Sequence, residues 1–332
     1  MKAISLFSGV GGLDAGFEQA GVEVTWAIEV NWRACLSYER HMGLRPACMP
    51  IQRVERFPDA ELVVACNPCQ GYSIIGNRDE HDPRNLLYEE VARCLTQVAP
   101  KYFVLENVPG LVKLYDGRAF KRVCQAMGTA GPGYVLSHDI LDAKDYGVAQ
   151  DRRRVFIVGV RRDLGASFDF DMVGKTHGPG TGRNFCVLRD VLRGLPRVRR
   201  SHYYHLEDDW PFFYMSRNRR RTWHQRSYTI MANWRHVPLH PRCPPLRNMS
   251  LNEWKFTADE SRYRRLSYIE CARVQGFSQK MIRALEGWPL EEQYRFVGNA
   301  VPPPMAKALA RAFVQFDEQL SARRAYALAY AR

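Results

Sequence analysis

The sequence predicts a doubly wound α/β fold with a mostly parallel sheet and a smaller second domain. Apolar runs rich in β-branched residues alternate with helical patterns as far as residue 161, which is typical of a parallel α/β sheet. With 332 residues, 46% of them hydrophobic, the chain can bury a full core. Over 162–263 the alternation stops and Arg, Pro, Gly, His and aromatic residues dominate. We therefore expect domains at 1–161 and 162–263, with a return to the first over 264–332.

Each expected element follows from its hydrophobic period, which is about two residues in a strand and 3.6 in a helix. Helical periodicity returns at 267–275, and Pro302-Pro-Pro304 leads into a last helix from about residue 305 to the C-terminus. The expected strands are 2–7, 22–28, 62–65, 102–105, 134–141 and 155–160, and the helices among them are 13–20, 31–41, 88–98 and 117–127.

The formal charge of +13 indicates a polyanionic partner, although a merely basic surface is the simpler alternative. Segment 162–263 holds 18 Lys and Arg against 10 Asp and Glu, so most of the excess lies where the α/β alternation stops. Nine cysteines without framework spacing favour reduced thiols and a cytoplasmic protein. The N-terminus enters a strand at once, and no run of about 18 apolar residues could span a membrane.

Cys69 is the most informative residue, because Pro68-Cys69-Gln70 follows a buried strand at the edge where α/β enzymes present reacting groups. The spacing Cys66-Asn-Pro-Cys69 also allows a redox pair or half a zinc site. No second such pair or suitably spaced His pair occurs, so we expect no metal. A structural buried cysteine is the plainer alternative.

Three charged residues are candidates to act with this thiol. Glu106 ends the strand 102–105, so its carboxylate emerges at the same sheet edge, where partial burial would raise its pKa and suit a proton donor. Arg152 and Arg154 alternate along the start of a strand, so both can face one pocket. Such arginines are usually surface charges, but beside a thiol they lower its pKa and hold an oxygen atom.

The turn Phe7-Ser-Gly-Val-Gly-Gly12 is glycine-rich and joins a strand to a helix. Glycines there permit close approach of a ligand to the backbone, although such a turn is often only a turn. Glu29 ends the second strand, where a carboxylate can bind both ribose hydroxyls of a nucleoside. Alone, it would be an ordinary solvated acid.

Together these residues resemble the DNA (cytosine-5)-methyltransferase family over the whole chain, because six motifs follow in the family's order. They are Phe7 to Gly12 (motif I), Pro68-Cys69-Gln70 (IV), Glu106-Asn107-Val108 (VI), Gln150-Asp-Arg152-Arg-Arg154 (VIII), Arg265-Leu-Ser with Glu270 and Arg273-Val-Gln-Gly-Phe277 (IX), and Gly298-Asn-Ala-Val301 (X). The resemblance implies a Rossmann-like, S-adenosylmethionine-dependent methyltransferase fold with a target-recognition domain.

By this resemblance, the Cys69 thiolate adds to carbon 6 of a flipped-out cytosine while Glu106 protonates ring nitrogen 3, and carbon 5 takes the methyl group. Arg154 would hold the cytosine carbonyl oxygen, Arg152 the nucleophile loop, and Asn107 with Gln150 the surrounding geometry. The implied S-adenosylmethionine site comprises Phe7, Gly9, Gly11, Gly12, Leu13, Glu29, Ile51, Asn299 and Ala300.

The resemblance makes 162–263 the target-recognition domain, where basic side chains bind phosphates and guanines. Three departures from the family pattern stand out: Pro50 replaces an Asp that holds adenine, Asn67 changes the residue before Pro68, and Ser278 follows Phe277. The expected DNA contacts are Gln70, Ser73, Arg217, Arg219, Arg220, Arg221, Thr229 and Arg235.

We expect a monomeric, prokaryotic, nucleoid-associated enzyme that acts on double-stranded DNA, with any cognate restriction endonuclease acting separately. Two rival functions are a tRNA cytosine-5 methyltransferase and a catalytically idle DNA-binding regulator. The long, Arg-rich recognition segment favours duplex DNA over RNA. The presence of Cys69, Glu106 and both arginines argues against an idle protein.

Overall fold

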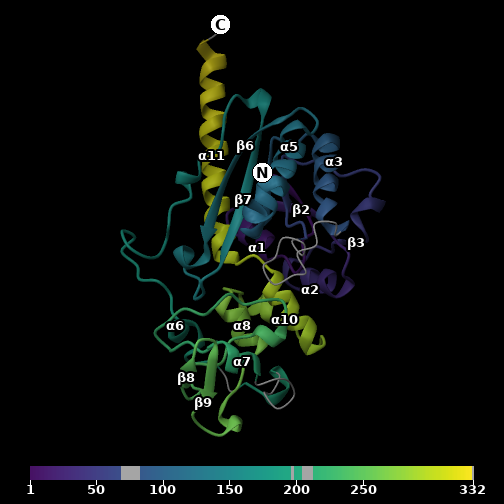
Figure 1. The fold of residues 1–332 in the computed structure, drawn as a ribbon. Coiled ribbons are helices and arrows are strands. Elements are labelled where there is room, and N and C mark those ends of the chain that lie inside the picture. The colour runs from purple at the N-terminus through teal and green to yellow at the C-terminus, as the bar shows by residue number, and fades with distance from the viewer. Residues whose placement is uncertain (69–82, 196–197, 204–211, 331–332) are drawn as a thin grey trace. The chain divides into compact units, whose positions relative to one another are not determined.

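A seven-stranded sheet organises the first half of the chain (Figure 1). The structure, a computed structural model, describes residues 1–68, 83–195, 198–203 and 212–330. Contacts divide the chain into one unit of Met1–Leu141, Arg153–Lys175 and Met305–Arg332, and a second of Asp142–Arg152 and Thr176–Pro304.

The strands of the sheet run in the order β3-β2-β1-β4-β5-β7-β6. Neighbouring pairs from β3 to β5 are parallel, and β7 is antiparallel to β5. The order reverses between β1 and β4, and such a reversal opens a crevice at the carboxyl ends of the strands. The strands are β1 (Lys2–Leu6), β2 (Glu23–Glu29), β3 (Ala47–Cys48), β4 (Leu62–Ala65), β5 (Tyr102–Asn107), β6 (Tyr134–Asp142) and β7 (Arg153–Arg161).

Helices cover both faces of this sheet because side chains alternate between the faces along each strand. Phe103 and Leu105 belong to a core that includes residues of α3 and α5. Tyr102 instead contacts Phe313 of α11, with ring centroids 5.0 Å apart. The helices of the first unit are α1 (Gly12–Glu18), α2 (Trp32–Met42), α3 (Tyr88–Val98), α4 (Gly110–Lys113), α5 (Arg118–Thr129) and most of α11 (Pro303–Tyr330).

The second unit consists of short elements joined by long connections. A small core gathers around Tyr214, Leu239 and Tyr263. The elements are α6 (Leu188–Leu192), α7 (Phe212–Ser216), the antiparallel hairpin of β8 (Leu246–Ser250) and β9 (Glu253–Phe256), α8 (Tyr268–Val274), α9 (Gln279–Ala284) and α10 (Leu290–Asn299).

The structure confirms the α/β fold class, and all expected strands and helices occur near their expected residues. The units differ in extent from the expected domains, since 142–152 and 264–304 belong to the second unit and 162–175 to the first. For 264–304, part of the reason lies in helix packing. Helix α8 packs against α6 and α10, a tertiary contact that composition does not report. The elements β3, α4, α6, α7, α9 and α10 and the β8–β9 hairpin were not expected, because most are too short to establish a hydrophobic period.

Candidate active site

Three neighbouring strands of the first unit end side by side at the reversal of strand order. Leu6 of β1 is the register partner of Ala65 in β4, which in turn is the partner of Leu105 in β5. Phe7, Cys66 and Glu106 come next on the three strands. The glycine-rich turn, the start of the segment that leads to Cys69 and the candidate proton donor therefore share one edge of the sheet.

Asn67 and Asn107 join two of these strand ends. The amide nitrogen of buried Asn107 donates to the carbonyl oxygen and to Oδ1 of Asn67, at 3.4 and 3.3 Å. Asn107 Oδ1 accepts from the backbone N–H of Val108 at 2.8 Å. The chain is thus anchored two residues before Cys69. The unusual Asn67, noticed in the sequence only as a departure from the family pattern, takes part in this anchor.

Glu106 and Arg154 form an ion pair, with Arg154 Nε 2.9 Å from Glu106 Oε1. Their side chains are only 10% and 13% exposed. Antiparallel pairing sets Glu106 of β5 opposite Phe156 of β7, two residues beyond Arg154. The structure thus brings together two of the residues expected to face one pocket, through an ion pair that the sequence did not predict. A guanidinium stabilises negative charge on a neighbouring carboxylate whereas burial opposes it, so a raised pKa for Glu106 stays a prediction.

Arg152 binds backbone of the second unit, and its expected contact with the loop of Cys69 lies outside the described residues. It precedes β7, is 1% exposed, and donates to the carbonyl oxygens of Ile230 at 2.8 Å, Gly298 at 2.8 Å and Ala300 at 3.0 Å. All four residues belong to the second unit. The alternation of side chains along a strand does not apply to Arg152, because β7 begins only at Arg153. Within the second unit, Arg152 therefore positions backbone.

Gln150 also binds the backbone of Ile230. The fully buried Gln150 accepts from the Ile230 N–H at 3.1 Å and also donates to Gln275. Both backbone polar groups of Ile230 are thus bound by motif VIII side chains. Thr229, next to it, donates its hydroxyl to the Asp151 carbonyl oxygen at 2.6 Å. Three consecutive residues, 150 to 152, therefore hold the dipeptide Thr229-Ile230, which includes the expected DNA contact Thr229.

The candidate cofactor residues of the first unit are connected through Glu29. One carboxylate oxygen accepts from the Gly9 N–H at 3.0 Å and the other from the Asn31 N–H at 2.8 Å. Phe7 and Gly9 both have φ of 55°, and a Cβ built on Gly9 would meet no atom within 4 Å. A carboxylate beside open space at a strand end fits a ribose-bearing group. Gly11 also has a positive φ, and Gly12 and Leu13 begin α1.

Exposed apolar side chains follow Glu29, and sequence reasoning missed them. Val30 is 65% exposed, Trp32 51% and Met49 39%. Because Glu29 is the register partner of Cys48, Val30 and Met49 follow on adjacent strands. Ile51, expected to contact the cofactor, is 4% exposed and belongs to the core. In the sequence, the apolar residues beside the candidate ribose-binding Glu29 could have identified this surface.

The arginines of the recognition segment divide into two groups. Arg219 donates to the His236 carbonyl oxygen at 2.9 Å, and burial lowers its pKa. Arg220 donates to the carbonyl oxygen of Cys243 at 2.7 Å, and Arg221 lies over the Tyr228 ring at 3.9 Å. These three are partly buried, whereas the remaining two candidates, Arg217 and Arg235, are exposed.

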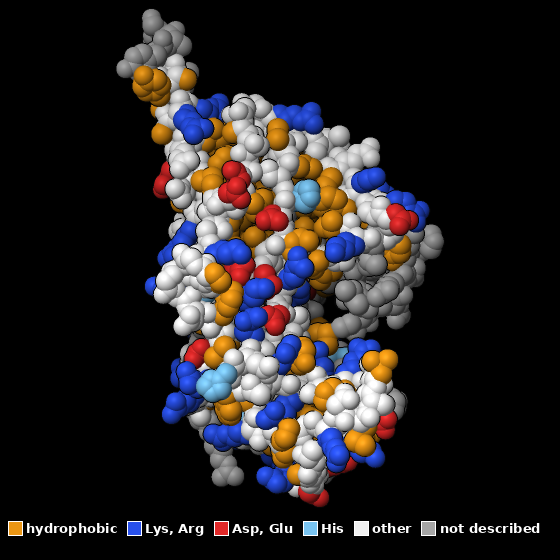
Figure 2. Space-filling model, turned by 60° about the vertical axis from the view of Figure 1, so that its left-hand side comes forward, with side chains coloured by type: hydrophobic (Ala, Val, Ile, Leu, Met, Phe, Trp, Pro, Cys, Tyr) orange, Lys and Arg blue, Asp and Glu red, His pale blue; other side chains and the backbone are white. Residues whose placement is uncertain are grey.

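Basic side chains are widespread on the face drawn in Figure 2, where Lys and Arg are more abundant than Asp and Glu. Within the described ranges, no group of three or more His, Cys, Asp or Glu residues is arranged to hold a metal ion. Nor does this part of the chain contain a helix long and apolar enough to cross a membrane.

The family model for C-5 cytosine-specific DNA methylases matches residues 1–315. The chain belongs to that family. It is 34% identical to the type II methyltransferase M.BspRI of Lysinibacillus sphaericus, over 95% of this chain and 82% of that protein. It is 37% identical to M.FnuDI of Fusobacterium nucleatum, over 94% and 93% respectively. The crystal structure of the S. pombe Dnmt2 methyltransferase shares its fold, with a TM-score of 0.70 at 19% identity, covering 96% of this chain and 99% of that one.

Family membership confirms the resemblance seen in the motifs, and with it DNA cytosine-5 methylation as the activity of this methyltransferase. Cys69, Gln70 and Ser73 lie outside the described residues. Asn299 and Ala300 close α10 in the second unit. The assignment of individual residues to the nucleophile, the cofactor and DNA stays a prediction.

Proposed function

We propose that this methyltransferase uses Cys69 as its nucleophile and Glu106 as its proton donor on a cytosine flipped out of duplex DNA. One observation supports this most directly. The strand that leads to Cys69 ends between the glycine-rich turn and the Glu106–Arg154 ion pair, and the Asn67–Asn107 hydrogen bonds anchor the chain there. A short segment then separates the anchor from the thiol.

The reaction begins when the Cys69 thiolate adds to carbon 6 of the cytosine ring and ring nitrogen 3 takes a proton from Glu106. The electron density gained makes carbon 5 nucleophilic. S-adenosylmethionine, when bound, supplies the methyl group for carbon 5. Loss of the proton from carbon 5 to a base, departure of the thiolate and return of the proton on ring nitrogen 3 to Glu106 restore the neutral aromatic ring and the enzyme. The base must leave the helix because its carbon 6 is inaccessible in a stacked duplex.

Arg154 has two tasks in this proposal. Its Nε orients the Glu106 carboxylate, at 2.9 Å, and the remaining guanidinium donors hold the cytosine carbonyl oxygen. A planar guanidinium can do both because its N–H groups point in fixed, different directions. Arg152 and Gln150 contribute by holding Ile230, and they position the chain rather than contact the reacting atoms.

The proposed S-adenosylmethionine site is built around Glu29. Its carboxylate, already held by the N–H groups of Gly9 and Asn31, retains lone pairs for the ribose hydroxyls. The exposed Val30 and Met49 offer apolar surface for the adenine ring, which offsets the Asp contact that Pro50 cannot make. Phe7, Gly11, Gly12, Leu13, Ile51, Asn299 and Ala300 remain proposed cofactor residues by their motifs.

We assign DNA recognition to 162–263, with Arg217 and Arg235 as the foremost candidates for contact because both are exposed. Arg219, Arg220, Arg221 and Thr229 would act chiefly by shaping the recognition surface, since each is partly buried. Gln70 and Ser73 would contact DNA from the loop of the nucleophile. A monomer that serves a type II restriction–modification system, with a separate endonuclease, is the proposed biological setting.

The test compares Cys69→Ser with Cys66→Ser on duplex DNA that contains 5-fluorocytosine. The native protein should form a covalent complex that survives denaturation, and Cys66→Ser should do the same. Cys69→Ser should bind DNA yet form no covalent complex, because a hydroxyl stays protonated near neutral pH. Covalent capture by Cys69→Ser would overturn the assignment of the nucleophile. Parallel methyl-transfer reactions with tRNA should give no product.

A further inference from the structure

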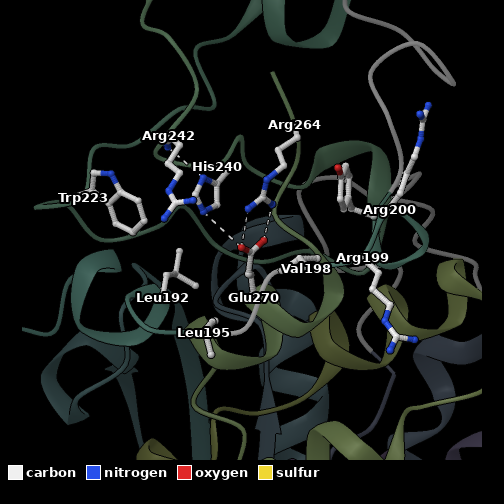
Figure 3. A pocket seen from close by; sticks show the side chains of 11 residues that line it. Leu192, Leu195, Val198, Arg199, Arg200, Trp223, His240, Arg242, Arg264 and Glu270 are labelled. Carbon is white, nitrogen blue, oxygen red and sulfur yellow. Dashed lines mark hydrogen bonds and ion pairs between the residues drawn. The ribbon is translucent and has the colours of Figure 1, made fainter. Parts of the chain in front are cut away.

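The second unit contains a cavity of about 1110 Å³ that none of the proposed catalytic or cofactor residues lines (Figure 3). Its wall combines arginines with apolar and aromatic side chains. Such a mixture is typical of sites that bind a nucleotide, whose phosphate is anionic and whose base is flat and weakly polar. The lining residues are Leu192, Leu195, Val198, Arg199, Arg200, Tyr203, Trp223, His240, Arg242, Arg264 and Glu270.

The negative charge of Glu270, the acidic residue of the cavity wall, is already neutralised. Glu270 accepts two hydrogen bonds from Arg264, at 2.7 and 2.8 Å, and one from the Ser267 N–H at 2.8 Å. His240 Nε2 lies 3.4 Å from the same carboxylate. Burial lowers the pKa of His240 to about 4, with a further contribution from the nearby arginines. The charges of Glu270 and Arg264 thus cancel, and His240 adds no charge at neutral pH.

Arg199 and Arg242 bring positive charge to the cavity. Within the described residues, neither guanidinium has a hydrogen bond or an ion pair. Both side chains are exposed, so an incoming anion can reach them. Figure 3 shows Arg242 extending beside His240, on the side of the cavity where Trp223 lies.

Trp223 provides the flat apolar surface. Its ring meets the His240 ring edge-on, with centroids 5.4 Å apart, and the Arg242 guanidinium carbon lies 6.0 Å from the Trp223 centroid. The Trp223 carbonyl oxygen accepts from the Arg189 N–H at 2.9 Å, which fixes the backbone of this wall. An aromatic ring held beside a cation can stack a base while the cation binds its phosphate.

We propose that this cavity binds a phosphate-bearing nucleotide, with the phosphate at Arg242 and the base against Trp223. The nucleotide is either part of a DNA strand or free in solution, and the chemistry of recognition is the same for both. The DNA source rests on the proposed function, because the strand would then belong to the substrate of the methyltransferase. Binding of a free nucleotide does not depend on the proposed function.

The test uses the full-length protein, with Arg242→Ala as the main variant and Arg247→Ala as a charge-matched control. Arg247 is exposed on β8 and does not line the cavity. Calorimetry measures the binding of deoxyadenosine 5′-monophosphate, of inorganic phosphate and of a duplex. Arg242→Ala should weaken nucleotide binding at least about tenfold, the loss expected for a charge-assisted hydrogen bond, and Arg242→Lys should restore part of it. Arg247→Ala should bind the mononucleotide and inorganic phosphate like the native protein.

Competition separates the two sources. If saturating duplex displaces the mononucleotide and Arg242→Ala lowers the salt slope of duplex binding by about 0.9, the nucleotide belongs to DNA. If mononucleotide binding persists with duplex present, the ligand is free. Equal binding of inorganic phosphate and mononucleotide would contradict the role of Trp223. Identical binding of the mononucleotide by the Arg242 and Arg247 variants would overturn the proposal, while covalent capture through Cys69 tests the proposed function separately.

Discussion

Replacing Arg152 with lysine tests whether its main task is to hold the backbone of the second unit. The native guanidinium donates to three carbonyl oxygens, at 2.8, 2.8 and 3.0 Å, from a site that is 1% exposed. Lysine keeps the charge but has one nitrogen in place of the two that bind. It therefore cannot reach the Ile230 carbonyl and the Gly298 and Ala300 carbonyls in the same geometry.

The expected loss follows from these contacts. A hydrogen bond to a charged group contributes roughly 1.5–3 kcal/mol, and a buried carbonyl left unpaired costs about 1–3 kcal/mol. Because at least one carbonyl oxygen loses its hydrogen-bond donor, Arg152→Lys should lower the free energy of unfolding by about 3 kcal/mol. That is a large fraction of the roughly 5–15 kcal/mol that stabilises a typical domain.

Urea unfolding followed by circular dichroism measures the change, and hydrogen exchange of the Ile230 amide localises it to the second unit. Arg153→Lys is the matched control, because Arg153 is the exposed neighbour and its replacement should change stability by less than about 0.5 kcal/mol. A loss below about 1 kcal/mol for Arg152→Lys, with unchanged protection of Ile230, would refute this reasoning.

Three further outcomes are expected. Gly298→Ala should lower the melting temperature, with a cost of about 3 kcal/mol, because the added Cβ would lie 2.2 Å from the carbonyl carbon of Met231; an unchanged melting temperature would contradict this close packing. Burial raises the pKa of Asp14 to about 6, so the stability that its protonated form contributes is present below about pH 4 and is lost as the pH rises through 6. Asp14→Asn retains an acceptor for Ser5 but does not ionise. Between pH 4 and pH 8, its free energy of unfolding should therefore rise by up to about 3 kcal/mol relative to that of the native protein. The same difference between the two proteins at both pH values would disprove this prediction. Glu29→Ala should weaken S-adenosylmethionine binding by about 1.5–3 kcal/mol, and unchanged affinity in calorimetry would remove Glu29 from the cofactor site.

Asn67 illustrates the limit of motif comparison. The sequence shows only that it departs from the family pattern, whereas the structure shows that Asn107 donates to both of its oxygen atoms. The two residues are 40 positions apart, and their contact requires β4 and β5 to be neighbours. A hydrogen bond across strands depends on register, which a single sequence does not report.

The sequence by itself determined the α/β class, nearly every element of the sheet, and the candidates Cys69, Glu106 and Glu29, because hydrophobic periods and strand-end polar residues are local signals. Only the tertiary structure decided that Arg154 pairs with Glu106 while Arg152, two residues away, binds the backbone of Ile230, Gly298 and Ala300. In sequence the two arginines are equivalent members of one motif. Their partners lie 48 to 148 residues distant along the chain, so the start of β7 and the packing of distant loops assign each its role.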